Sequence, residues 1–160
     1  MPAGRAIDVP LETLPHVDEH SVEIDAEPQA TWDALLPVVH GSFGDAASSR
    51  IARLLGCEQT ERGGDPEHPG ATVPGFVVAR AIKPTLYALL GAHRFSRYAL
   101  VFRIDPIDEG DRSRLRAETR AEFPGTKGRA YRTLVIGTRG HVLVVRRLLR
   151  AVKRRAERAR

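Results

Sequence analysis

A strongly basic amphipathic segment at the end of the sequence constrains the fold more than any other feature. The 34 residues 127–160 hold 12 of the 25 Lys and Arg residues but only one acid, Glu157. The pattern predicts one long helix over about residues 131–155, and its apolar face requires a large apolar partner. Apolar or weakly polar residues recur at helical spacing at Tyr131, Leu134, Val135, Thr138, Val142, Val145, Leu148, Leu149, Val152 and Ala156.

The stretches before this segment have the composition of β-strands. They cover residues 75–82, 85–95, 97–104 and 114–123. The last one is the clearest, because apolar or small residues alternate in it with charged ones, as in an antiparallel strand with one buried and one solvated face. The predicted buried faces carry Tyr98, Leu100, Phe102 and Ile104 in one strand and Leu115, Ala117, Thr119, Ala121 and Phe123 in the other.

The sequence of the N-terminal half predicts one more strand and two short helices. Residues 20–26 alternate as a half-buried strand, and Pro28 suits the first position of a helix, which Pro37 is expected to end or bend. Asp45 and Gly56 are typical N-cap and C′ residues of a second helix with Ile51, Leu54 and Leu55 on its apolar face. The order of elements predicts an α+β fold with a curved antiparallel sheet around a long C-terminal helix.

The length of 160 residues suits one domain. We expect residues 1–19 to be a poorly ordered lead-in and residues 20–158 to form the domain. Cys57 is the only cysteine, so disulfides and thiolate metal clusters are excluded. The N-terminus lacks the apolar core of a signal peptide, and no apolar run approaches the ~18 residues that span a bilayer. These features predict a cytoplasmic protein.

Three segments resemble a known group of proteins. They are "HSVEIDAEPQATWDAL" near the N-terminus, "YALVFRIDPI" with "SRLRAETRA" in the strands, and "YRTLVIGTRGHVLVVRRLLRAVKRRAE" at the end. Together they resemble the START-like, or SRPBCC, superfamily, which includes polyketide cyclase-like proteins and pollen-allergen-type carriers. The resemblance implies a helix-grip fold with an apolar cavity between the sheet and the last helix. Five strands are evident here, whereas the superfamily commonly has six or seven.

The predicted cavity supplies the candidate ligand-binding residues. A few polar groups that converge in an apolar pocket orient a small ligand. His93 either faces the cavity as a hydrogen-bonding or proton-transfer group or lies partly exposed at a strand end, and the same alternatives hold for His141 on the last helix. The candidate ligand-binding residues are Tyr98, Leu100, Phe102, Ala117, Thr119, His93, Tyr131, Thr138 and Val142.

Other chemistry-bearing residues give weaker signals. His16, Asp18, Glu19 and His20 form a possible metal cluster by composition, but their spacing matches no ligand set. Trp32 has the spacing of a core residue. We therefore predict no cofactor and no metal.

Three functions remain open on the sequence alone. The first is binding of a small hydrophobic or amphipathic molecule, and the second is a cyclase- or dehydratase-like enzyme that uses His93, Tyr98 or His141. The third is contact of the basic helix with anionic membrane or nucleic acid. Its simpler alternative is a solvated outer face that makes at most a weak electrostatic contact.

Overall fold

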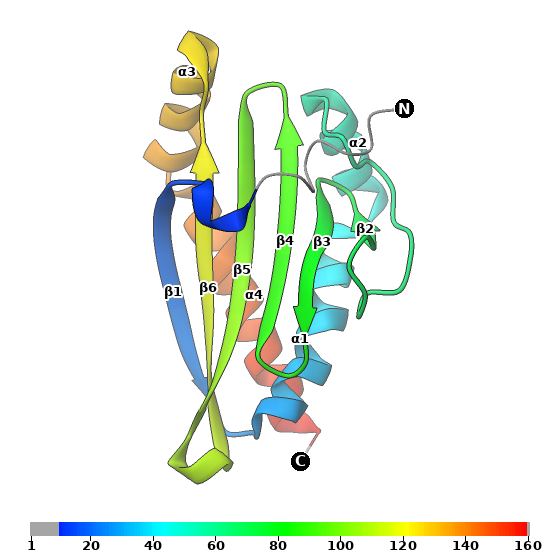
Figure 1. Ribbon diagram of the computed structural model, residues 1–160, viewed down its shortest axis with the longest axis vertical. Helices are drawn as coiled ribbons and strands as arrows, with labels where there is room; N and C mark the ends of the chain where they lie inside the picture. Colours follow the sequence, from blue (N-terminus) through cyan, green and yellow to red (C-terminus); the bar gives the residue numbers. More distant parts are fainter. Residues whose placement is uncertain (1–9, 160) are drawn as a thin grey trace.

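The computed structural model describes residues 10–159 and contains one six-stranded antiparallel sheet. Its order is β1-β6-β5-β4-β3-β2, so the first strand of the chain lies beside the last (Figure 1). Strands β5 and β6 run the length of the molecule and twist together at one end. The bounds are β1 His16–Ile24, β2 Thr72–Val73, β3 Phe76–Ile82, β4 Leu86–His93, β5 Ser96–Ile107 and β6 Arg112–Glu122.

All four α-helices follow strand β1 or strand β6. They are α1 Pro28–Phe43, α2 Ala46–Leu55, α3 Gly125–Gly137 and α4 Gly140–Arg158. Helices α1 and α4 cross behind the sheet, whereas α2 and α3 lie near one end of it (Figure 1). The predicted α+β helix-grip architecture is confirmed: a curved antiparallel sheet, two helices after the first strand, and a long C-terminal helix.

The main core lies between the concave face of the sheet and helices α1 and α4. Trp32 of α1 meets Tyr87 of β4 edge to face, with ring centroids 5.7 Å apart. Both rings are buried, as are Phe102 of β5 and Val152 of α4 in the same cluster. The prediction that Trp32 is a core residue is therefore confirmed.

The convex face of the sheet is covered by a smaller apolar cluster. Leu11, the first residue of the 3-10 helix Leu11–Thr13, and Leu14, which follows this helix, pack there with side chains of β3, β4 and β5. Strand β1 begins at His16, four residues before the predicted start. The folded part of the chain thus begins before residue 20, and only residues 1–9 of the expected lead-in lie outside the described residues.

The predicted single long helix is two helices. Helix α3 ends at Gly137, and Arg139 adopts a left-handed backbone with φ of 55° before α4 begins at Gly140. The two glycines in "GTRG", Gly137 and Gly140, each destabilise a helix, which favours a break at this point. The break changes which side chains face the core. Leu134 and Thr138, both expected on the apolar face, are exposed.

Two local features add to the sequence-based predictions. Helix α1 continues through Pro37 to Phe43, so of the two effects expected of this proline an end of the helix is absent. The short strand β2 was not predicted because two residues show no alternation. Helix α2 has the expected caps: Asp45 accepts a hydrogen bond from the Ser48 amide at 2.7 Å, and Gly56 is left-handed.

A substitution in α4 tests the packing of this helix. Leu149→Asp puts a charge into the main core, where Leu149 is 3% exposed, and should lower the free energy of unfolding by about 4 kcal/mol. Leu143→Asp in the same helix is the matched control, because Leu143 is 70% exposed, and should change it by less than about 0.5 kcal/mol. Urea unfolding followed by circular dichroism measures both. Equal effects would contradict the packing described above.

Candidate functional site

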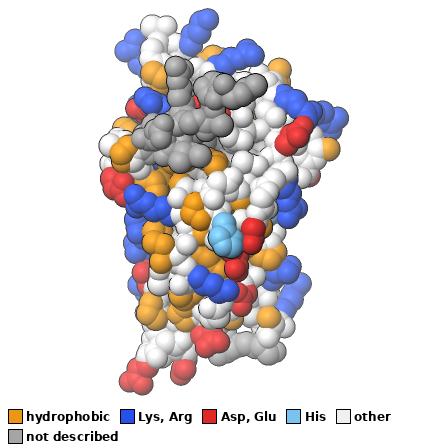
Figure 2. All heavy atoms as spheres, turned by 45° about the vertical axis from the view of Figure 1, so that its right-hand side comes forward, with side chains coloured by type: hydrophobic (Ala, Val, Ile, Leu, Met, Phe, Trp, Pro, Cys, Tyr) orange, Lys and Arg blue, Asp and Glu red, His pale blue; other side chains and the backbone are white. Residues whose placement is uncertain are grey.

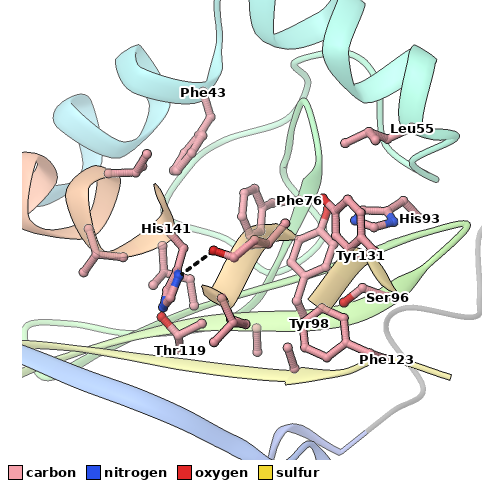
Figure 3. Close-up of a pocket in the computed structure, with 17 residues that line it drawn as sticks. Phe43, Leu55, Phe76, His93, Ser96, Tyr98, Thr119, Phe123, Tyr131 and His141 are labelled. Atoms are coloured by element: carbon pink, nitrogen blue, oxygen red, sulfur yellow. Dashed lines mark hydrogen bonds between the residues drawn. The ribbon is translucent and has the colours of Figure 1, made fainter. Parts of the chain in front are cut away.

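An apolar cavity of about 300 Å³ lies between the concave sheet and the helices at one end of the molecule (Figure 3). Strands β4, β5 and β6 form its floor, whereas α3, the first turns of α4, and residues from α1 and α2 form its walls. Both helices that meet at the break contribute to the lining: Val135 and Ile136 near the end of α3, and His141, Val144 and Val145 at the start of α4. The lining comprises Phe43, Leu55, Phe76, His93, Ser96, Tyr98, Ala99, Leu100, Thr119, Ala121, Phe123, Tyr131, Val135, Ile136, His141, Val144 and Val145.

Close approach of two strands holds Tyr98 in the cavity wall. Gly91 of β4 pairs with Tyr98 of β5, and a Cβ at Gly91 would overlap the Tyr98 ring and the Gly75 carbonyl oxygen. Only glycine fits there. The Tyr98 hydroxyl donates a hydrogen bond of 2.7 Å to the Gly75 carbonyl and lies 3.8 Å from Cys57 Sγ. Its proton is therefore committed to the backbone, which argues against Tyr98 as an acid or base.

Aromatic rings gather at the end of the cavity nearest α2. Tyr131 of α3 stacks on Phe95 with ring centroids 5.5 Å apart and meets His93 edge to face at 4.8 Å. The Tyr98 ring also contacts His93, with ring centroids 5.4 Å apart. Figure 3 shows His93, Tyr98 and Tyr131 grouped together, away from His141. This end offers flat apolar surfaces that suit a ring-containing ligand.

The hydrogen bonds of His93 define its tautomer. The Phe95 amide donates to His93 Nδ1 at 3.1 Å, so Nδ1 carries a lone pair. Burial lowers the pKa of His93, which favours the neutral ring. The proton then resides on Nε2, with which no other described residue bonds. His93 therefore presents a neutral N–H donor at the aromatic end of the cavity.

A second polar group lies at the opposite side of the cavity, where α4 meets β1. His141 Nε2 is 2.8 Å from Asp18 Oδ2, and His141 Nδ1 is 3.3 Å from the Val135 carbonyl, the dashed line in Figure 3. An ionised carboxylate and a carbonyl both accept only, so both bonds form together when the imidazole is doubly protonated. Although burial raises the pKa of Asp18, the hydrogen bond and charge of His141 lower it overall.

A β-bulge brings Asp18 to this position. His16 pairs with Arg120 and Asp18 pairs with Thr119, so one extra residue separates two adjacent pairs. The bulge sends His16 to the convex face, where its Nδ1 is 3.0 Å from Glu118 Oε1, and Asp18 to the concave face. The four residues of the possible metal cluster are thereby divided between two faces. Among the described residues, no group of three or more His, Cys, Asp and Glu side chains could hold a metal ion.

Two further polar atoms lie buried beside this pair. Asp18 Oδ1 and Thr119 Oγ1 have no hydrogen-bond partner among the described residues, although their backbones are paired across β1 and β6. A buried polar atom without a partner costs free energy. The Thr119 hydroxyl is nevertheless close enough to contribute to the lowered pKa of Asp18.

Five of the nine predicted ligand-binding residues line the cavity, and four do not. Phe102 and Ala117 lie deeper in the filled core, Val142 is half-buried outside the lining, and exposed Thr138 donates to the Leu134 carbonyl at 2.6 Å. Periodicity alone could not separate core from cavity. The five that line it are His93, Tyr98, Leu100, Thr119 and Tyr131.

Several cavity residues were missed by sequence reasoning. Phe43 and Phe76 face each other across the wall with ring centroids 5.0 Å apart, and Asp18 reaches His141 across 123 residues. No local pattern signals such pairs. Cys57 is half-buried, and burial raises the pKa of its thiol, which disfavours a thiolate nucleophile. No described helix is long and apolar enough to cross a membrane.

The fold of this chain is similar to those of several solved protein structures. The matches include a truncated norcoclaurine synthase from Thalictrum flavum, 13% identical with a TM-score of 0.55 over 88% of this chain and 94% of that chain. A START superfamily protein from Mycobacterium smegmatis is 14% identical with a TM-score of 0.51, and the match covers 91% of this chain and 99% of that chain. A protein from Nitrosospira multiformis is 17% identical with a TM-score of 0.53, and the match covers 87% of this chain and 94% of that chain.

No family model and no curated protein sequence matches this chain. At such low identities the structural likeness concerns the fold alone. The chain has the helix-grip fold of START-like proteins, as its sequence resemblance implied.

The Asp18–His141 pair leads to a prediction about stability and pH. Because folding lowers the pKa of Asp18, its stabilising effect is complete above the ordinary value of 3.8 and is lost as pH falls through the lower folded-state value. Asp18→Asn should therefore lower the free energy of unfolding by about 1 kcal/mol at neutral pH, and the deficit should vanish in acid. Urea titrations over a pH series measure this difference.

The matched control for this prediction is Glu19→Gln in the same strand. Glu19 is exposed and lies 3.4 Å from Arg116, so the substitution should have little effect at any pH. A deficit for Asp18→Asn that stays constant down to acid pH would contradict the ion pair with His141.

Proposed function

We propose that this protein binds a small, mostly apolar molecule that carries a hydrogen-bond acceptor such as a carbonyl group. The observation that carries the proposal is the cavity of about 300 Å³, which is lined by apolar and aromatic side chains with few polar groups. Its volume is at the lower end of the range for small-molecule sites. The helix-grip fold supports the same function.

His93 supplies the proposed point of specificity. Its neutral ring offers the Nε2 proton to the cavity, so the complementary ligand group is an acceptor. The stacked Phe95 and Tyr131 rings beside it favour a flat ligand. A ring system with a carbonyl substituent meets both requirements, and a ligand with a full negative charge at this end would lack a charged partner.

Filling the cavity tests whether the ligand binds there. Ala121→Phe adds a ring to a buried lining position, and it should weaken binding of the uncharged fluorescent probe phenylnaphthylamine by at least about tenfold. The control is Ala130→Phe, which adds the same ring at an exposed position of α3 and should leave binding unchanged. Probe emission is the readout, because Trp32 lies in the core and does not line this cavity. Equal affinity in wild type and Ala121→Phe would refute this site.

A matched pair of ligands tests the role of His93. Acetylnaphthalene and ethylnaphthalene have similar shapes, but only the former has a carbonyl oxygen. His93→Phe should weaken displacement of the probe by acetylnaphthalene about three- to tenfold, as expected for one neutral hydrogen bond, and should leave ethylnaphthalene nearly unaffected. Equal losses for both ligands would indicate that His93 contributes only packing.

The His141–Asp18 pair favours a second function, acid–base catalysis on a bound ketone. A doubly protonated imidazole in an apolar cavity can donate a proton to the carbonyl oxygen of a ketone while a solvent water molecule accepts the proton from the adjacent methyl group, which gives the enol, and the carboxylate partner keeps the imidazole oriented. To do so, His141 must exchange its 3.3 Å contact with the Val135 carbonyl for the ligand. Exchange of the methyl protons of acetylnaphthalene with deuterated solvent, followed by NMR, tests this function. A wild-type rate equal to that of His141→Gln would exclude it.

A further inference from the structure

A second pocket, of about 310 Å³, lies between helix α1 and the loop that joins α2 to β2. Helix α1 contributes Trp32 and His40 to it, and the loop contributes Arg62, Asp65 and Glu67. Among the described residues, none lines both this pocket and the apolar cavity. Helix α1 and strand β2 lie on the right of Figure 1, the side that Figure 2 turns forward, where acidic and basic side chains lie beside a histidine.

The hydrogen bonds of His40 define what this residue offers to the pocket. The Tyr87 hydroxyl donates its only proton to the Pro66 carbonyl at 2.9 Å, so it accepts the proton of His40 Nε2 at 2.8 Å. Burial and the charge of Arg62 lower the pKa of His40, which favours the neutral ring. His40 Nδ1 then carries a lone pair. It has no hydrogen-bond partner among the described residues, although His40 is only 2% exposed.

Trp32 offers the opposite kind of group to the same pocket. Its indole Nε1–H has no acceptor among the described residues, although Trp32 is only 1% exposed. Trp32 and His40 lie on one face of α1, about two turns apart. Buried polar groups in folded proteins nearly always have partners. A molecule that satisfies both of these groups must carry an acceptor for the indole and a donor for the imidazole.

The proline inside α1 adds a second acceptor. Pro37 has no N–H, so the Asp33 carbonyl, four residues earlier, lacks its usual helical donor. Asp33 and Pro37 both line the pocket. The pocket therefore combines one donor, Trp32 Nε1–H, with two acceptors, His40 Nδ1 and the Asp33 carbonyl oxygen.

We propose that this pocket is a second ligand site, which binds a small neutral molecule through a primary carboxamide group. The amide oxygen accepts the proton of Trp32 Nε1, and the two amide N–H groups donate to His40 Nδ1 and to the Asp33 carbonyl. The site is separate from the apolar cavity and does not depend on the function proposed for that cavity.

The charges of the pocket disfavour ionic ligand groups. One cation, Arg62, lines it together with three carboxylates, those of Asp33, Asp65 and Glu67. A ligand carboxylate would meet this excess of negative charge, and without a proton it could not donate to His40. An ammonium group could donate to His40 but could not accept from the indole. The neutral amide meets both requirements in one planar group.

The single tryptophan makes this site directly observable. Trp32 gives the only indole N–H resonance in a nitrogen–proton correlation spectrum, and benzamide should shift this resonance saturably. Methyl benzoate keeps the carbonyl oxygen but has no N–H, so it should bind at least about tenfold more weakly, and benzoate should also bind more weakly. Equal affinities for benzamide and methyl benzoate would overturn the proposal. A resonance that responds to none of the three would overturn it as well, because the pocket would then hold only water.

A substitution isolates the acceptor atom of His40. In His40→Gln the side-chain amide replaces Nε2 and still donates to Tyr87, but nothing replaces the lone pair of Nδ1, so benzamide should bind about tenfold more weakly. The matched control is His68→Gln, which changes an exposed histidine of the same loop that does not line the pocket and should leave the affinity unchanged. An unchanged affinity in His40→Gln, or equal losses in both variants, would refute the role of His40. If circular dichroism shows that His40→Gln does not fold, the ligand series on the wild type decides alone.

Filling the apolar cavity separates this site from the one proposed above. Ala121→Phe should weaken binding of phenylnaphthylamine but leave the response of the Trp32 resonance to benzamide unchanged. Loss of both responses in this variant would place benzamide in the apolar cavity and overturn the second site. A wild-type protein that binds phenylnaphthylamine but does not respond to benzamide would refute the second site alone.

Discussion

The rest of the structure depends on the burial of one apolar face of α4 against the concave sheet and α1. Val145, Leu148, Leu149, Val152 and Ala156 are all at most 5% exposed and join strands that come from both halves of the chain. The apolar face of the curved sheet must be covered by another element, and helix α4 gains most of its stability from packing its apolar face. Each element thus stabilises the other. The position of the cavity follows, since it begins where this packing ends.

The break at Thr138 and Arg139 divides the C-terminal helical segment into α4, most of which packs in the core, and α3, which lines the cavity. Beyond it, α4 packs in the main core, whereas α3 contributes Tyr131, Val135 and Ile136 to the cavity. Two polar groups with different electrostatics face this space. His93 is a neutral donor among rings, and His141 is hydrogen-bonded to the Asp18 carboxylate. A ligand that spans the cavity would meet a hydrogen-bond donor at one side and a histidine–carboxylate pair at the other.

The distribution of charge also follows the architecture. Acids are concentrated in the first 126 residues, and many of them pair with arginines of β6, as Glu23 and Asp105 do with Arg114 and Arg116. These pairs run along the outer side of the sheet. Helices α2, α3 and α4 carry Lys and Arg with a single acid, Glu157, although Arg53 of α2 pairs with Glu61 in the loop that follows. The C-terminal helices are therefore the most basic part of the described chain.

The sequence by itself determined the features that depend on neighbours along the chain. The alternation in β6 and the caps of α2 at Asp45 and Gly56 are local, so period and backbone preference predict them. Only the tertiary structure decided which side chains meet. The bulge that turns Asp18 toward His141 and the exposure of Leu54 on α2 arise from strand register and helix placement. These contacts join residues far apart in the chain, and no local preference encodes them.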